Sequence, residues 1–155
     1  MTKNSRFFIN LASAISEELD NIDKLNEEIK TIPEDAPFSG RAKGSVLHDF
    51  YNCCERIFKK IAVEINGGMP ETDMWHKDLL YKMTKPVHGL RPRVISEDLA
   101  AELDDYLSFR HIFRNIYGFE LKGERLKRLA DNLYTVSERL KNEVREFLEK
   151  VGGEK

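Results

Sequence analysis

Two arginines one helical turn apart, Arg110 and Arg114, are the residues of this chain best suited to bind an anion. They stand among side chains that otherwise form one apolar stripe of a predicted helix. At about 100° per residue, this stripe contains Leu99, Leu103, Tyr106, Leu107, Arg110, Phe113, Arg114 and Tyr117. A guanidinium group keeps its charge and is costly to bury alone. The spacing therefore predicts that both arginines face an anion, a carboxylate or an interface.

Two kinds of partner remain open for this arginine pair. A structural alternative is a pair of salt bridges to acids of another helix, such as Glu55 or Asp49. The functional alternative is a phosphate group, because guanidinium donors match phosphate oxygens in geometry and charge. Two charged groups on an apolar stripe are also easier to accommodate at a wet subunit interface than in a dry core, which favours a homodimer.

Length and composition predict one soluble domain spanning residues 1–155. The chain has 155 residues, of which 41% are hydrophobic and 34% are charged, so it can bury a core of its own. The net charge is −2 and the isoelectric point is near 6.1. This balance argues against a protein that coats nucleic acid by bulk electrostatic attraction. Any contact with RNA is expected to be local.

The cysteines and histidines give no pattern of a metal or disulfide site. The two cysteines, Cys53 and Cys54, are adjacent and lack the spacing of a zinc site or a redox pair. No two histidines are three or four positions apart, so neither a metal nor another cofactor is expected. Without a long apolar run or a signal-peptide pattern, we expect a cytoplasmic protein with no membrane segment.

Apolar periodicity predicts helices throughout the chain. Long amphipathic helices are expected over residues 5–32, 46–65, 96–117 and 126–148, and a shorter helix capped by Thr72 or Asp73 is expected to end near Met83. The prolines and glycines of residues 33–44 indicate a loop, and nothing alternates with the period of a strand. The predicted fold is all-α, an up-and-down four-helix bundle with one additional short helix.

Residues 85–93 form a second candidate site between the third and fourth predicted helices. This segment has two prolines, a glycine and several basic side chains, which is typical of a structured surface loop with positive charge. Arg91 and Arg93 are therefore candidates for binding phosphate or RNA beside the arginine pair.

The run that contains the arginine pair resembles the signature motif of the HEPN superfamily of helical-bundle proteins. Arg110 is followed five positions later by Asn115 and two positions after that by Tyr117. The HepT-like branch has an arginine, four residues, a histidine, one residue and a tyrosine in this order. The resemblance covers about residues 40–130 and includes Phe50-Tyr51, Glu55-Arg56-Ile57-Phe58, Trp75-His76-Lys77-Asp78-Leu79-Leu80, Arg91-Pro92 and Tyr117-Gly118-Phe119-Glu120-Leu121.

The resemblance implies a metal-independent endoribonuclease that acts as a homodimer, with motif residues of both subunits lining a shared cleft. Arg110 matches the arginine that stabilises the phosphate, and Arg114 and His111 are further candidates for contacts with RNA. Tyr117 matches a tyrosine that a partner nucleotidyltransferase antitoxin modifies with adenylyl groups, which add negative charge and block RNA. The family thus implies the toxin component of a toxin–antitoxin pair.

The chain departs from the motif at the catalytic histidine, where it has Asn115. An amide can hydrogen-bond a phosphate oxygen but cannot carry a proton near neutral pH. His111 points in a different direction on the helix, while His48, His76 and His88 remain open as replacements. His76, next to Trp75, is interpreted as part of a packing cluster with a polar edge.

Two alternative functions follow from this departure and from the structural alternative above. One is a catalytically inactive HEPN bundle that binds or regulates a nucleotidyltransferase. The other is a monomeric helical adaptor with buried arginine salt bridges.

Overall fold

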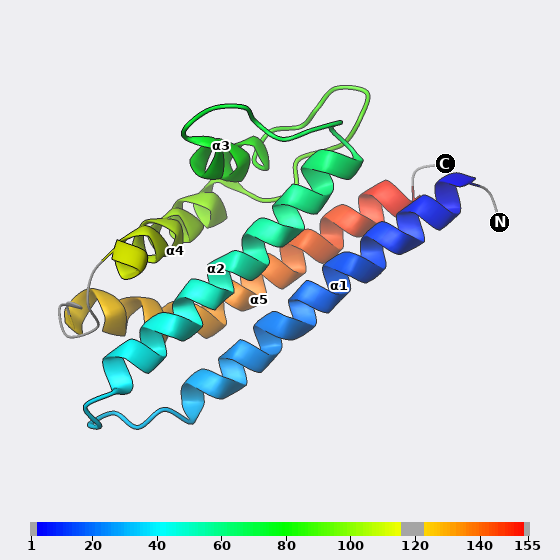
Figure 1. Ribbon diagram of the computed structural model, residues 1–155. Helices are drawn as coiled ribbons and strands as arrows, with labels where there is room; N and C mark the ends of the chain where they lie inside the picture. The colour runs from blue at the N-terminus through cyan, green and yellow to red at the C-terminus, as the bar shows by residue number, and fades with distance from the viewer. Residues whose placement is uncertain (1–2, 116–122, 154–155) are drawn as a thin grey trace.

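Five helices account for most of the residues that the structure describes (Figure 1). The computed structural model describes residues 3–115 and 123–153. The helices are α1 (Lys3–Lys30), α2 (Ser39–Glu64), α3 (Trp75–Lys82), α4 (Glu97–Asn115) and α5 (Gly123–Gly153). Within the described residues, the only β-type pairing is an isolated antiparallel bridge between Val87 and Arg91. The all-α prediction, with long helices and one short one, is confirmed.

The three longest helices lie side by side and enclose the core (Figure 1). The helix α2 packs against each of the other four, and α3 contacts both α2 and α4. Side chains such as Ile15 of α1, Phe50 and Phe58 of α2, and Leu133 of α5 are fully buried. Burying this apolar surface is the main force that holds the bundle together. None of the helices in the described part of the chain is long and apolar enough to cross a membrane.

The helix α2 begins at Ser39, inside the segment predicted to be a loop. The Ser39 side chain is buried and its hydroxyl donates to the Pro33 carbonyl, while Ala42 N donates to Phe38 O at 2.9 Å. Gly40 lies against α5, where a Cβ atom would stand 3.6 Å from Leu126. The two glycines of this segment therefore belong to a helix, and the predicted loop 33–44 is correct only in its first part.

The starts of α3 and α4 differ in how well the sequence predicted them. The predicted cap of α3 by Thr72 or Asp73 is wrong, because α3 begins at Trp75 and its preceding residue makes no side-chain cap bond. The Thr72 hydroxyl instead donates to Asp78 Oδ2 at 2.5 Å. The predicted start of α4 is confirmed, since Ser96 Oγ accepts a hydrogen bond from Leu99 N at 3.2 Å.

Candidate functional site

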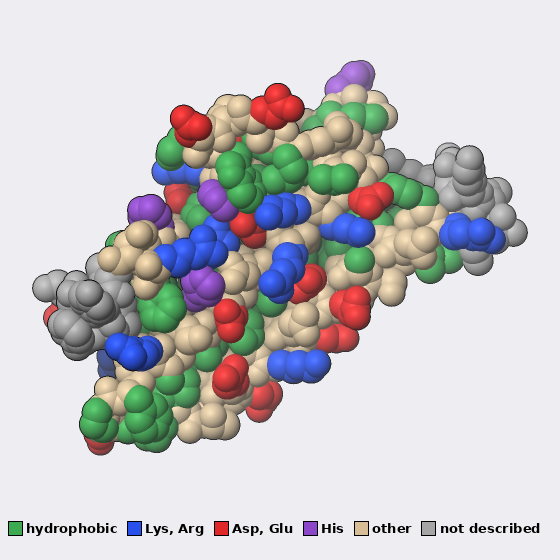
Figure 2. All heavy atoms as spheres, viewed as in Figure 1, with side chains coloured by type: hydrophobic (Ala, Val, Ile, Leu, Met, Phe, Trp, Pro, Cys, Tyr) green, Lys and Arg blue, Asp and Glu red, His purple; other side chains and the backbone are tan. Residues whose placement is uncertain are grey.

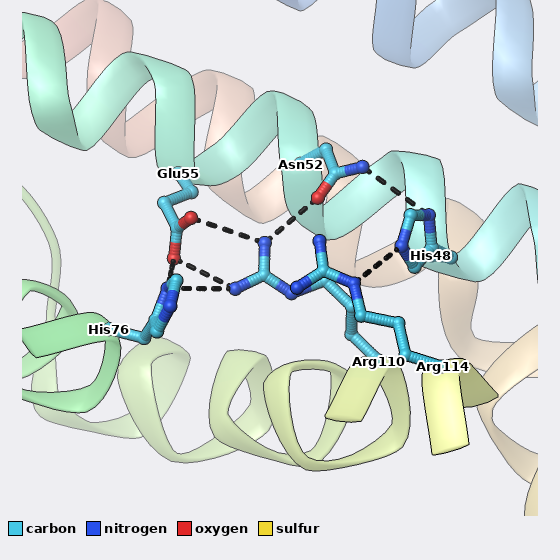
Figure 3. A network of polar contacts seen from close by, with 6 residues as sticks. All are labelled: His48, Asn52, Glu55, His76, Arg110 and Arg114. Carbon is cyan, nitrogen blue, oxygen red and sulfur yellow. Dashed lines mark hydrogen bonds and ion pairs between the residues drawn. The ribbon is translucent and has the colours of Figure 1, made fainter. Parts of the chain in front are cut away.

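A network of polar side chains lies where α2, α3 and α4 meet (Figure 3). The space-filling view shows basic and histidine side chains gathered on this face of the molecule (Figure 2). The polar network has six members from three helices, which are His48, Asn52, Glu55, His76, Arg110 and Arg114. We refer to these six residues as the arginine network.

Helical spacing brings the members of the arginine network together. His48, Asn52 and Glu55 are separated by four and three positions, so they lie on one face of α2. Arg110 and Arg114 are one turn apart on α4 and extend toward that face (Figure 3). The short helix α3 supplies the remaining member, His76, from its first turn.

Arg110 is a buried arginine that is fully engaged by its own chain. Its Nη1 lies 3.2 Å from Glu55 Oε1 and its Nη2 lies 3.0 Å from Glu55 Oε2, which makes the pair bidentate. The two side chains are only 3% and 7% exposed. Nη1 also donates to Asn52 Oδ1 at 2.8 Å, and the guanidinium carbon stands 4.9 Å from the centre of the Tyr51 ring.

The salt bridge to Glu55 is the structural alternative that the sequence offered for Arg110. The expected second acid, Asp49, makes no bond to either arginine among the described residues. Phosphate stabilisation by Arg110 would require it to leave Glu55, so this predicted role does not fit the geometry of the chain.

Glu55 is held in its ionised form. Burial raises the pKa of this carboxyl group, but hydrogen bonds from Arg110 and His76, together with their charges, outweigh burial and lower the pKa below its ordinary value of 4.5. The oxygens accept bonds from two helices at once. The carboxylate therefore fixes the relative positions of α3 and α4 on the surface of α2.

His76 presents one ring nitrogen to this carboxylate. Its Nδ1 lies 2.8 Å from Glu55 Oε2 and 3.0 Å from Arg110 Nη2. The contact with Arg110 would need an unprotonated Nδ1, because a guanidinium only donates, whereas the contact with the ionised Glu55 oxygen needs a proton on Nδ1. The contact with Glu55 is the shorter of the two, so we assign the Nδ1–H tautomer. The unprotonated Nε2 is then the nitrogen available to a substrate. The side chain is 37% exposed, and the ring stacks on Trp75 with centroids 3.6 Å apart.

Arg114 forms the exposed end of the arginine network. Its Nε donates to His48 Nε2 at 3.0 Å. No carboxylate of the described residues lies within salt-bridge distance of its guanidinium. His48 in turn contacts Asp49 Oδ1 and Asn52 Nδ2 through Nδ1, each at 3.3 Å. Arg114 is therefore a positioned cation that still has donors for a ligand.

The remaining motif residues lie outside the arginine network. The Asn115 amide donates to the carbonyl oxygen of His111 at 2.6 Å, one turn earlier in the same helix. Both residues are exposed. Tyr117, the predicted site of modification, falls outside the described residues. The structure thus brings Arg110 and Arg114 together but does not join Asn115 or His111 to them.

Arg91 and Arg93 have opposite environments in the loop between α3 and α4. Arg91 is 5% exposed, and its Nε donates to Asn66 Oδ1 at 2.9 Å. Its Nη atoms donate to the carbonyl oxygens of Lys82, Lys85 and Pro92 at 2.9–3.2 Å. Arg91 therefore holds the loop together, and the prediction that it binds phosphate does not fit this arrangement. Arg93 is exposed and remains a candidate.

A shallow groove between α1 and α2 adjoins the arginine network. It encloses about 360 Å³, and its lining includes Lys24, Arg56 and Asp49 together with Asn52 of the network. Two of these residues are basic and one is acidic, and Arg56 also lies 3.8 Å from Glu18 of α1. Within the described residues, no group of three or more His, Cys, Asp or Glu side chains is arranged to hold a metal ion.

Sequence reasoning identified the two arginines but missed most of their partners. The sequence did not indicate Asn52, and it offered Glu55 as a structural partner of the arginines. It favoured packing for His76 and left this residue open as one of three replacements for the missing histidine. A usable signal was present, because His48, Asn52 and Glu55 recur at helical spacing on one amphipathic helix. That pattern indicates a polar stripe on α2 with the same requirement for partners as the stripe on α4.

Comparison with known proteins identifies the family. A family model described as a HepT-like protein matches residues 42–151, which is most of the chain and includes the whole arginine network. Searches of curated proteins and of solved structures found no match. The matched family agrees with the all-α architecture and with the motif that begins at Arg110. The chain belongs to the HepT-like family of HEPN proteins.

Proposed function

We propose that this protein is an RNA-directed endoribonuclease that acts as a homodimer, as the toxin component of a pair with a nucleotidyltransferase antitoxin. Membership of the HepT-like family supports the general class, because the HEPN superfamily includes toxins and ribonucleases. Cleavage by attack of the ribose 2′-hydroxyl on the adjacent phosphate needs a group that accepts a proton and a cation that stabilises the developing charge. It needs no metal ion.

The observation that carries this proposal is the exposed guanidinium of Arg114 at the end of the arginine network. Arg114 is exposed, is oriented by His48, and is bonded to no carboxylate of the described residues. Arginine gains most from a phosphate because two of its donors can bind two oxygens together. We assign phosphate binding to Arg114, while Arg110 holds Glu55 in place.

The groove between α1 and α2 supplies the neighbouring part of the proposed RNA path. Lys24 and Arg56 line this groove, which reaches the arginine network at Asn52. Because the net charge of the chain is −2, a local cluster of cations, and not the charge of the whole molecule, has to attract RNA. Arg93 and His111, both exposed, are further positions where RNA could be contacted.

Tyr117 is the proposed site of control by the antitoxin. An adenylyl group on this tyrosine would bring a negative charge close to Arg114, three positions earlier in the chain. The added phosphate would compete with RNA for the same guanidinium. Co-expression with a minimal nucleotidyltransferase, followed by mass spectrometry of the peptide that contains Tyr117, tests this part of the proposal.

Cleavage of labelled single-stranded RNA of mixed sequence by the purified protein, in the presence of EDTA, tests the enzymatic function. We expect cleavage by the wild type and a loss of about 100-fold in the Arg114→Ala variant, since a cation at the developing charge is removed. Arg145→Ala is the matched control, because Arg145 is exposed on α5 outside the arginine network. A wild type that neither binds nor cleaves RNA would overturn the proposal.

A catalytically inactive partner of a nucleotidyltransferase is the second candidate, and the position of Asn115 favours it. The Asn115 amide is bonded to its own helix and cannot transfer a proton. The Asn115→His variant separates the two candidates. Ribonuclease activity that arises from none supports the inactive partner, whereas an existing activity that stays the same or falls supports a working site.

A further inference from the structure

We propose that His76 is the group that accepts the proton of the ribose 2′-hydroxyl during RNA cleavage, in place of the histidine that is absent at Asn115. This inference depends on the ribonuclease activity proposed above and assigns its missing catalytic residue. It rests on the contact between His76 and Glu55, on the accessibility of the imidazole ring, and on the contacts of both residues with Arg110 of α4.

The carboxylate of Glu55 orients His76 for this role. Its Oε2 lies 2.8 Å from Nδ1, closer than Arg110 Nη2 at 3.0 Å, so we place the proton on Nδ1 and the lone pair on Nε2. Stacking on Trp75 restricts rotation of the ring. The imidazole is 37% exposed, so a substrate can reach it without opening the core. A carboxylate behind a histidine also stabilises the imidazolium ion that forms when Nε2 takes up a proton.

Charged groups of two helices surround His76. Glu55 of α2 and Arg110 of α4 contact the ring, and the two form a salt bridge with each other. Lys59 of α2 stands 4.6 Å from the centre of the Trp75 ring, on which His76 stacks. These contacts hold the ring in place beside the arginine network.

The other histidines of the chain are less suited to accept a proton. The Nε2 atom of His48 already accepts a hydrogen bond from Arg114. His88 is exposed in the loop between α3 and α4, and His111 is exposed on α4 and contributes only its backbone carbonyl to a bond with Asn115. Among the described residues, His76 alone combines a carboxylate on one ring nitrogen with an unoccupied second nitrogen.

The proposed step is a transesterification that needs no further reactant. His76 Nε2 takes the proton of the 2′-hydroxyl, a bond forms between the 2′-oxygen and phosphorus, and the bond from phosphorus to the 5′-oxygen breaks. Arg114 stabilises the charge on the phosphate oxygens while the bonds change. The leaving 5′-oxygen takes a proton from water, and His76 returns its own proton to solvent. The products are a 2′,3′-cyclic phosphate and a 5′-hydroxyl end.

Replacing His76 with glutamine tests this assignment in the full-length protein. With labelled single-stranded RNA of mixed sequence, we expect kcat to fall by about 10²- to 10⁴-fold, which is the usual contribution of a general base. We expect KM to change little, because His76 is not assigned to binding. The wild type should lose activity as the pH is lowered, because a protonated general base cannot accept a further proton, and the variant should lack this dependence.

Two further measurements separate catalysis by His76 from a structural role. Added imidazole should restore part of the activity of the His76→Ala variant, which leaves space for it, and should not affect the Arg114→Ala variant. In the nitrogen NMR spectrum of the wild type, we expect the neutral His76 ring to carry its proton on Nδ1. His88→Gln is the matched control, and its activity should equal that of the wild type.

The outcomes distinguish this inference from the proposed function. If the wild type cleaves RNA and His76→Gln keeps the same rate and pH profile, His76 is not the proton acceptor and the ribonuclease proposal stands. A neutral ring protonated on Nε2 would also overturn the assignment. If the wild type cleaves no RNA, both proposals are overturned together.

Discussion

Glu55 and Arg110 form a buried ion pair on which several neighbours depend. Removing one member of such a pair leaves the other charged in an environment with little water, which costs more than the pair itself contributes. Arg110 cannot lose its charge, so replacing Glu55 leaves a buried guanidinium without a carboxylate, and this destabilises the fold. His76 and Asn52 are bonded to the same pair. The geometry of the whole site therefore depends on one carboxylate.

Replacing Glu55 with glutamine removes the charge while preserving the size of the side chain. We expect the free energy of unfolding at pH 7 to fall by about 3–5 kcal/mol, as measured by urea denaturation. Glu64→Gln is the matched control on the same helix, where an exposed pair with Lys60 is lost and the change should stay below about 0.5 kcal/mol. An effect of Glu55→Gln no larger than that of the control would contradict this account.

The stability contributed by Glu55 also depends on pH in a defined direction. Its pKa in the folded protein is lowered below the ordinary value of 4.5. The contribution is therefore complete above the unfolded value and is lost as the pH falls through the lower value of the folded state. We expect the difference in unfolding free energy between the wild type and Glu55→Gln to be constant above about pH 5 and to shrink below pH 4.5.

At the scale of the elements, the loop between α3 and α4 determines where His76 lies. Arg91 binds three carbonyl oxygens of this loop region and also Asn66, which follows α2. Gly89 has a φ angle of +79° at the turn that the Val87–Arg91 bridge closes, a conformation that favours glycine. The loop thus connects the end of α3 to the segment that follows α2, and through α3 it limits where His76 lies.

Replacing Arg91 with lysine tests the rigidity of this connection. Lysine has one donor group in place of a planar fork, so several buried acceptors would lose their partners. We expect the free energy of unfolding to fall by roughly 1–3 kcal/mol and backbone hydrogen exchange to become faster in residues 83–96. Arg93→Lys, an exposed position of the same loop, should change neither quantity. Unchanged exchange in Arg91→Lys would show that the loop does not depend on this side chain.

At the scale of the whole molecule, the outer face of α4 is the surface where a second subunit is expected. This face presents His111, Ile112 and Asn115 to solvent, and Arg114 lies next to it. A two-fold dimer through this surface would bring the two copies of Arg114 close to each other. Such an arrangement joins the two exposed cations at one cleft.

Light scattering of the wild type is expected to give the mass of a dimer. Ile112 is 36% exposed, and a charged residue there would be desolvated at the interface. We therefore expect Ile112→Glu to shift the protein to a monomer with an unchanged helical spectrum. Tyr134→Glu, at a 60% exposed position on α5, is the control and should remain dimeric. A monomeric wild type, or a dimer that survives Ile112→Glu, would contradict this placement.

The sequence by itself determined the helices, the family and the two arginines. Apolar positions that recur with the helical period define which face each helix buries, and that information is local to the chain. The same periodicity showed that Arg110 and Arg114 needed partners. The exact helix starts were harder to predict, because α2 includes Gly40 and Gly44 through its packing, which no local pattern reveals.

Only the tertiary structure decided which anion and which histidine belong to the arginines. Glu55 and Arg110 are 55 positions apart in the chain, and His76 joins them from a third helix. Their meeting depends on how α2, α3 and α4 pack and on the loop that Arg91 holds. Contacts between distant residues arise from the packing of whole helices, so a one-dimensional pattern can show that a partner is required but not which residue provides it.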